Sequence, residues 1–369
     1  MRKIIRVFCN AVDFDDVLLD TIKPIIEMGD HDGMYVTRHW KQGGHWRLHV
    51  ERGSASVDEL ASALADALPP HVSDPPRARE SADDSSLAVQ KRRAELENEV
   101  GPFLPVRPPG TVDVIDEPDR HSQQGGAEGA RWIAAFYEST NPHALDSIGL
   151  VRAGTSLQSI ALDLMVATAH CLSGVGLERG FVSFRSHADA FLTWWPEATG
   201  SRTVWESRSA RYGDAIVQRI QALVERLDAG RRLPRHVERW LDTAEPFFAR
   251  AGRSLARGEF TVDPPWAAAA RAGDETPDLR SSPFHSRAST VQGRVDKVWF
   301  AQYRLALNYL YLHLTRIGLA PYDRFLLCHL VADACENLYA TAAHEVLFPQ
   351  EGEGVRVPDE IESRRSRSS

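Results

Sequence analysis

Three groups of side chains in this sequence have types and spacings that could do chemistry, and one of them lies on a long apolar segment. Residues 295–315 are apolar almost all round, which predicts a buried helix. Four polar residues recur on it at i, i+4, i+7 and i+11: Arg304, Asn308, Tyr311 and Thr315. An unsatisfied buried polar group costs about 1–3 kcal/mol, so such groups must be paired or must line a wet cavity. Tyr303, a third of a turn away, suits core packing or a place beside this polar stripe.

A second group follows residues 180–189, where we expect a short strand that runs directly into a helix. This arrangement would leave Ser183, Arg185 and His187 near a helix N-terminus, where hydrogen-bond donors converge. An imidazole titrates near neutral pH, so His187 has the chemistry of a general base. The alternative interpretation is a partly exposed structural histidine.

The third group lies in a β-hairpin predicted by two short strands around a Gly-Gly turn. Strand periodicity places His45, Arg47 and His49 on one face and apolar residues on the other. Such a row of three groups could hold an anion or peptide carbonyls. It could equally be the wet face of an edge hairpin, where positive charge discourages aggregation.

The remaining sequence signals for chemistry are weak. Asp163 and His170 lie opposite the apolar stripe of a helix expected over residues 156–173, and we expect a solvated helix face there. The sequence contains no P-loop, GxSxG elbow or dinucleotide fingerprint, and no metal-ligand pattern is legible. Its four cysteines are scattered, which predicts free thiols.

The amino-acid composition restricts the class of protein to which these residues can belong. With 369 residues, 43% hydrophobic and 25% charged, the chain is a full-sized globular protein. It has no apolar run long enough for a membrane helix or a signal peptide, so we expect a cytoplasmic protein without a membrane partner. A net charge of −8 argues against nucleic-acid binding, although residues 201–260 hold twelve arginines against eight acidic residues. An acidic peptide could dock on that stretch.

The order of predicted elements indicates an α+β fold. Strand, helix, strand, strand and helix follow one another up to residue 68, which predicts a ferredoxin-like α/β N-terminal unit packed on a mainly helical remainder. Residues 263–289, rich in Pro, Ala, Arg and Asp, are expected to form a long loop or lid. We expect four regions: the α+β unit at 1–70, a mobile linker at 71–101, a helical catalytic region at 102–350 and a disordered tail at 351–369.

These residues also carry a family resemblance. The segments GHWRLHV at 44–50, NYLYLH at 308–313 and FLLCHL at 325–330 resemble the C-terminal elimination family of class I lanthipeptide dehydratases. Together with DLMVATAH at 163–170 and SFRSHAD at 183–189, they make the chain most similar to the stand-alone pyridine synthases of thiopeptide biosynthesis. The resemblance covers most of the chain except residues 73–90, 263–289 and the tail.

The resemblance implies a substrate and a reaction. The substrate would be a ribosomally made, azole-bearing precursor peptide with two dehydroalanines, and other enzymes of the pathway are possible partners. A formal four-plus-two aza-cycloaddition would close a macrocycle, and loss of water and of the leader peptide would leave a pyridine. The resemblance implies no metal or other cofactor.

The resemblance also implies roles for individual residues. His187 would exchange protons with the substrate amide, with Ser183 and Arg185 positioning it. The helix stripe would stabilise charge on the amide oxygen through Arg304 and Asn308, assisted by Tyr303 or Tyr311. The residues implied in peptide contacts are Arg38, His45, Arg47, His49, Tyr311 and Asp163.

Two departures from the elimination pattern favour the cycloaddition branch. Elimination enzymes carry arginines at the positions of both Arg47 and His49, and a histidine where this chain has Arg304. Two alternatives remain at this point. The chain could be a split elimination enzyme that removes glutamate from glutamylated Ser or Thr, or a non-catalytic scaffold that binds a leader peptide by β-augmentation.

Overall fold

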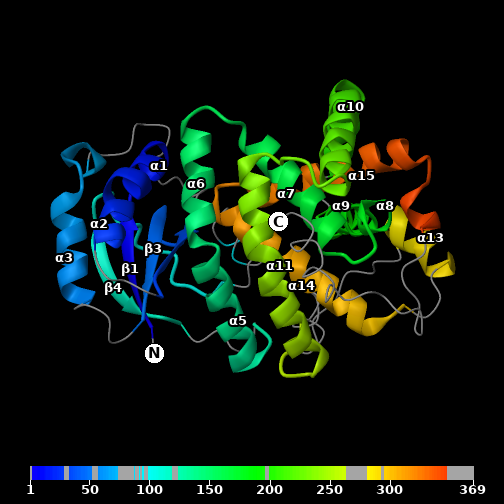
Figure 1. Ribbon diagram of the computed structural model, residues 1–369. Coiled ribbons are helices and arrows are strands. Elements are labelled where there is room, and N and C mark those ends of the chain that lie inside the picture. Colours follow the sequence, from blue (N-terminus) through cyan, green and yellow to red (C-terminus); the bar gives the residue numbers. More distant parts are fainter. Residues whose placement is uncertain are drawn as a thin grey trace. The chain divides into compact units, whose positions relative to one another are not determined.

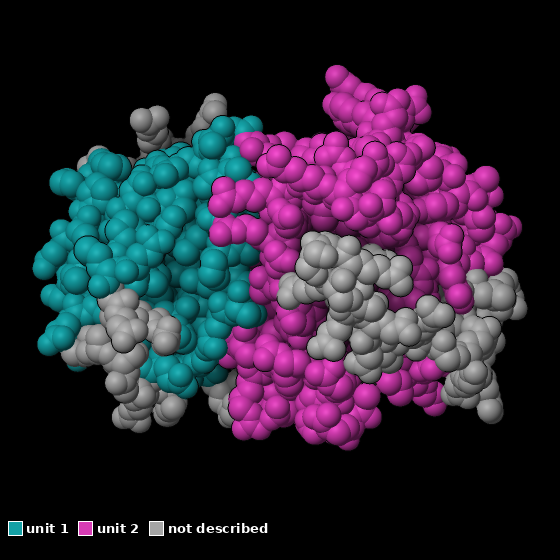
Figure 2. Space-filling model, in the orientation of Figure 1, with its two compact units in different colours: residues 1–119, 137–154, 316–318 teal, residues 120–136, 155–315, 319–369 magenta. Residues whose placement is uncertain are grey.

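The computed structural model describes residues 2–28, 33–51, 57–73, 99–118, 124–195, 199–262, 281–291 and 295–346, and three single positions, Leu87, Lys91 and Ala94. The chain divides into two compact units (Figure 2). Unit 1 comprises residues 1–119, 137–154 and 316–318, and unit 2 comprises residues 120–136, 155–315 and 319–369. Most of the predicted linker, the first part of the predicted loop and the predicted tail lie outside the described residues.

Unit 1 is built on a four-stranded antiparallel sheet with the strand order β2-β3-β1-β4 (Figure 1). The strands are β1 (Lys3–Phe8), β2 (Tyr35–His39), β3 (His45–Val50) and β4 (Val112–Asp116). Helical segments follow β1 and β3, so two βαβ units interlock in the ferredoxin-like manner. The structure therefore confirms the predicted α+β fold, and it adds β4 from a region expected to be mainly helical.

One face of this sheet forms the core of unit 1. Trp46, Leu48 and Val50 on β3 are fully buried, and the indole of Trp46 donates a hydrogen bond to the carbonyl of Phe14 at 2.8 Å. The covering segments are α1 (Phe14–Asp16), a π-helical turn (Val17–Ile22), α2 (Lys23–Met28) and α3 (Val57–Ala67). Unit 1 also contains α6 (Asn141–Arg152). Period-two alternation in β3 thus fixes which of its residues enter the core.

Unit 2 is helical throughout its described part (Figure 1). Its elements are α5 (Gly126–Ser139, whose last residues belong to unit 1), α7 (Leu157–Cys171), α8 (Leu177–Gly180), α9 (Val182–Trp194), α10 (Thr199–Asp228), α11 (Arg235–Ala256), α13 (Pro283–Val291), α14 (Lys297–Arg316), α15 (Pro321–Tyr339) and a 3-10 turn (Ala343–Glu345). Helix α15 packs against α9 and α10. No helix in the described part of the chain is long and apolar enough to cross a membrane.

Two local predictions are wrong. The short strand expected at the start of residues 180–189 is absent, because α8 ends at Gly180 and α9 begins at Val182. Phe181, Val182 and Phe184 favour strands in isolation, but all three are fully buried among helices here, and tertiary packing overrides that preference. The loop expected at residues 263–289 contains α13 in its described part, since Pro283 suits the first turn of a helix.

Candidate active site

A chain of three polar side chains connects α9, α14 and α15. The Nδ1 atom of half-buried His187 lies 2.8 Å from the hydroxyl of Tyr311, and that hydroxyl lies 3.4 Å from the Sγ atom of Cys328. Burial raises the pKa of the Tyr311 phenol well above its ordinary value and that of the Cys328 thiol to about 11. Both groups are therefore protonated at neutral pH. We call these three side chains the relay.

Cationic side chains near His187 keep its imidazole neutral. Desolvation, assisted by the charges of Arg324 and Arg304, lowers the pKa of His187 to about 3. The guanidinium of Arg324 lies 4.9 Å from the centre of the Tyr311 ring, and that of Arg304 lies 4.5 Å from the centre of the Phe300 ring. The same cations make this imidazole a weaker base than a free histidine, and they favour negative charge that develops nearby.

The depressed pKa of His187 gives a prediction that needs no substrate. Histidine in the unfolded chain titrates near 6.5, so falling pH protonates the unfolded state first and stability is lost as the pH falls from about 6.5 toward 3. NMR of the ¹⁵N-histidine-labelled chain should show the His187 nitrogens in a neutral form from pH 8 down to pH 5. The variant His187→Gln, which also assigns the signals, should weaken the dependence of Tm on pH in this range. A His187 titration near pH 6.5 would contradict the geometry.

A second histidine, which no sequence pattern singled out, lies close enough to His187 to affect its charge. His285 on α13 contacts the hydroxyl of Ser186 at 3.0 Å through Nε2 and that of Ser282 at 2.6 Å through Nδ1. Asp189 fixes the start of α13 by accepting a hydrogen bond from the backbone of Phe284 at 2.9 Å. Burial lowers the pKa of His285, so it too is neutral at pH 7. It lies in a segment whose composition predicted a loop.

Three of the four residues of the polar stripe lie on the less buried side of α14, whereas Tyr311 is buried. Arg304, Asn308 and Thr315 keep part of their surface accessible, whereas Leu305, Leu307, Leu310 and Leu314 are buried. The Asn308 side-chain amide makes no hydrogen bond within the described part of the chain. The stripe therefore presents a guanidinium and an amide on the same helix as Tyr311.

Tyr303 and Ser183 form a separate buried contact. The Tyr303 hydroxyl donates a hydrogen bond to the carbonyl of Gly180 at 2.7 Å. The side chain of Ser183 forms a further hydrogen bond with the Tyr303 hydroxyl. A Cβ atom at Gly180 would lie 2.8 Å from the carbonyl oxygen of Ala169, so only glycine permits this approach. Burial raises the pKa of Tyr303 well above its ordinary value. The structure thus brings these two predicted residues together, in a contact that joins α14 to α8.

Arg185 belongs to an ion-pair network and not to the relay. Its guanidinium pairs with Asp333 and, at 2.7 Å, with Glu336, and it donates to Nδ1 of His329 at 3.1 Å. Residues two apart lie on opposite sides of a helix, so the helical start of α9 turns Arg185 away from His187. The expected strand-to-helix junction would have left both near a helix N-terminus. The network fastens α9 to α15.

Asp163 does not lie on a solvated helix face, contrary to expectation. Only 2% of its surface is exposed, and its two oxygens accept hydrogen bonds from Arg219 at 2.6 and 2.7 Å and from His236 at 2.8 Å. Burial raises the pKa of Asp163, but these hydrogen bonds outweigh it and hold the pKa below its ordinary value. His170 pairs separately with Asp228 at 3.0 Å. Asp163 therefore joins α7 to α10 and α11.

The predicted hairpin residues belong to unit 1, and their face is not wet. The register places β3 between β2 and β1, and His45, Arg47 and His49 are all buried. Arg47 donates to Nε2 of His45 at 3.3 Å, and the ring of His49 stacks on Tyr35 at 4.3 Å between centroids. Desolvation lowers the pKa of His45 and of His49, so this row holds one cation and two neutral imidazoles. The edge-hairpin alternative is wrong.

Arg38 lies on the opposite face of the sheet from that row. It pairs in register with Trp46, and its guanidinium stacks over that indole at 4.7 Å. It also pairs with Asp15 and donates from Nε to the carbonyl of Arg316 at 3.2 Å. The structure therefore places Arg38 on a different face from the three β3 residues, although the resemblance implied peptide contacts by all four.

The fold agrees with comparisons to known proteins. The chain belongs to the lantibiotic biosynthesis dehydratase C-terminal family, whose model matches residues 4–335. Among solved structures, the chain is similar to TbtD, the pyridine synthase of thiomuracin biosynthesis, with 30% identity, a TM-score of 0.66 and coverage of 92% of this chain and 98% of that one. It shares its fold with TsrL at 19% identity, a TM-score of 0.69 and coverage of 96% and 99%. No curated protein sequence matches. The resemblance expected from the sequence is confirmed.

The described residues contain no group of three or more His, Cys, Asp or Glu side chains that could hold a metal ion. None of the four cysteines, all of which the structure describes, forms a disulfide, as predicted. The relay itself consists of an imidazole, a phenol and a thiol, with two guanidinium groups close to the imidazole.

Proposed function

We propose that this chain is a thiopeptide pyridine synthase, which joins two dehydroalanines of an azole-bearing precursor peptide into a pyridine-centred macrocycle. The similarity to TbtD over nearly the full length of both chains supports the proposal. The observation that carries the chemistry is the 2.8 Å contact between His187 and Tyr311 beside Arg304 and Arg324. These groups suit a reaction that moves protons on an amide.

The proposed reaction begins with a proton shift in the substrate. The amide before the second dehydroalanine passes its N–H proton to its own oxygen, which gives a hydroxy-azadiene. This diene adds to the alkene of the first dehydroalanine, and two new C–C bonds close a six-membered ring. Loss of water removes the hydroxyl group. Loss of the first dehydroalanine's nitrogen then completes the pyridine, and the leader departs as its carboxamide. The sequence balances without an oxidant.

The relay suits this proton shift because it has two neutral forms. In one form the Tyr311 phenol donates to Nδ1 of His187, and Nε2 carries a proton that it can give. In the other form Nδ1 donates to the phenol, which donates to Cys328, and Nε2 can accept a proton. His187 can therefore take the amide proton and return one to the oxygen. A positioned acid or base of this kind contributes about a hundred- to ten-thousand-fold in rate.

The remaining residues of the proposed site would stabilise charge on the substrate or hold groups in position. Arg304 and Asn308 would stabilise negative charge on the amide oxygen while the proton is in transit. Holding the two alkenes together supplies up to about 7–11 kcal/mol of the barrier. Ser183, Tyr303 and Arg185 would support the helices that carry the relay. Peptide contacts by Asp163 and by the hairpin residues stay a prediction.

Two substrates separate this proposal from its alternatives. The purified chain is incubated with a linear azole peptide that contains two dehydroalanines, and separately with a peptide that carries a glutamyl ester on Ser. Mass spectrometry should show a macrocycle from the first peptide and no change in the second. Conversion of the ester to dehydroalanine would select the elimination alternative. Binding of both peptides without conversion of either would select the scaffold.

A further inference from the structure

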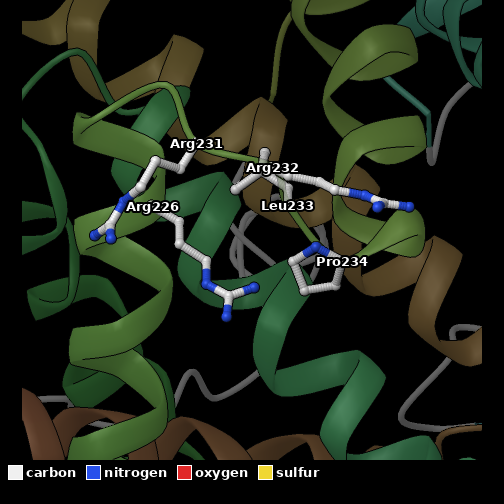
Figure 3. Close-up of a pocket in the computed structure, with 5 residues that line it drawn as sticks. All are labelled: Arg226, Arg231, Arg232, Leu233 and Pro234. Atoms are coloured by element: carbon white, nitrogen blue, oxygen red, sulfur yellow. The ribbon is translucent and has the colours of Figure 1, made fainter.

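The turn between α10 and α11 forms an arginine-lined hollow that the proposed reaction does not use (Figure 3). Its volume is about 500 Å³, and it is lined by Arg226, Arg231, Arg232, Leu233 and Pro234. We call it the arginine pocket. The three arginines are exposed, while Leu233 and Pro234 are half-buried and form an apolar floor.

The arginines of this pocket keep most of their charge uncompensated. Arg231 lies 3.8 Å from a carboxylate oxygen of Glu225, which is a loose contact, and it also donates to the Glu225 carbonyl at 3.4 Å. Arg226 and Arg232 form no ion pair with any residue that the structure describes. Asp228, the other carboxylate of this turn, pairs with His170. The pocket is therefore locally cationic on a chain whose net charge is −8.

The arrangement of the guanidinium groups favours an extended anionic ligand. In Figure 3 the guanidinium of Arg226 lies on one side of Pro234 and that of Arg232 on the other. Because these guanidinium groups point in different directions, a peptide with spaced carboxylates could contact more than one of them. Arginine pairs well with carboxylates, and the floor of Leu233 and Pro234 can accept apolar side chains between them.

We propose that the arginine pocket binds an acidic segment of the precursor peptide outside the reacting core. The identity of the peptide rests on the proposed function. The position of its binding site rests on charge complementarity with the arginine pocket. The pocket holds the peptide, while the relay acts on the dehydroalanines. Loss of the pocket should therefore raise KM and leave kcat unchanged.

A binding experiment on the full chain tests the pocket without any turnover. The probe is a fluorescein-labelled twelve-residue peptide with four Glu spaced by Leu and Ala, and the matched probe has Gln in place of Glu. Fluorescence anisotropy at low salt should show binding of the Glu peptide only, with affinity lost at high salt. The triple variant Arg226→Gln, Arg231→Gln, Arg232→Gln should weaken binding about tenfold, as expected for three exposed ion pairs.

The matched control removes the same three charges from elsewhere on the arginine-rich stretch. Arg208, Arg211 and Arg250 are exposed residues of α10 and α11 outside the pocket. Their triple Gln variant should bind the Glu peptide like the wild type. Equal losses in the two triple variants, or equal binding of the Gln peptide, would overturn the inference. Tighter binding of a twelve-nucleotide RNA than of the Glu peptide would also overturn it.

A turnover experiment separates this inference from the proposed function. The substrate is the linear bis-dehydroalanine peptide with the Glu sequence attached as its leader. An unchanged KM in the pocket variant would overturn the docking inference and leave the proposed function intact. If the wild-type chain binds the Glu peptide through the pocket but makes no pyridine, the proposed function fails and the pocket stands as a peptide site.

Discussion

Replacing His187 by Gln should lower the rate of pyridine formation by about a hundredfold or more, while the affinity for the peptide and the Tm near pH 7 stay nearly unchanged. Glutamine is similar in size and can keep a hydrogen bond to Tyr311, but it cannot exchange a proton at the position of Nε2. The loss should fall on kcat, because the group acts on the reacting amide. Single-turnover kinetics under saturating peptide measure it.

A variant of another histidine in unit 2 serves as the control for losing an imidazole group. His170 is also partly buried, and it pairs with Asp228 instead of with the relay. The variant His170→Gln should retain the wild-type kcat. The variant Tyr311→Phe should lose rate together with His187→Gln, and the double variant should be little worse than either single one, because the two side chains act as a unit. Wild-type kcat in His187→Gln, with intact folding, would remove the relay from the mechanism.

The largest expected loss of stability follows substitution of Arg185. The side chain is 11% exposed, and Arg185→Leu leaves Asp333 and Glu336 without their cation. Although burial raises the pKa of Asp333, His329 and Arg185 hold it well below its ordinary value, so the carboxylate stays charged. Breaking such a pair costs about 3–5 kcal/mol of the free energy of unfolding. Urea denaturation at pH 7 measures this loss.

A second substitution, Arg185→Lys, decides whether the role of this side chain is structural or catalytic. Arg185→Lys keeps the charge but not the planar fork, so it should recover part of the stability and a kcat close to wild type. Arg208→Leu, an exposed substitution on α10, should change the free energy of unfolding by less than about 0.5 kcal/mol. A hundredfold loss of kcat in Arg185→Lys, at unchanged stability, would contradict the structural assignment.

The sequence was informative wherever a local pattern decided the structure. The stripe on α14 could be predicted because the spacing i, i+4, i+7 and i+11 places its residues on one face of a helix, whatever packs against that helix. The alternation in β3 predicted which face carries Trp46 and which carries Arg47. It did not predict that the polar face is buried, because Phe8 contacts the His45 ring and Glu117 pairs with His49 from other parts of the chain.

Prediction from the sequence failed at positions whose structure depends on residues far away along the chain. Asp163 is buried because Arg219 and His236 reach it from segments 56 and 73 residues away, and no pattern around Asp163 indicates this. The start of α9 looks like a strand because its aromatic and β-branched residues fit both states, and only helical neighbours decide between them. His285 was missed because its surroundings are rich in Pro, Ser and Ala, a composition that predicts a loop.

Oxygen labelling tests most directly whether this chain forms a pyridine after a proton shift on an amide. The linear bis-dehydroalanine peptide is made with ¹⁸O in the carbonyl that precedes the second dehydroalanine. After incubation with the purified chain, mass spectrometry should show an unlabelled pyridine macrocycle and the leader carboxamide in equal amounts, because the labelled oxygen leaves as water. A macrocycle that keeps the label, or a peptide that stays linear, would contradict the account.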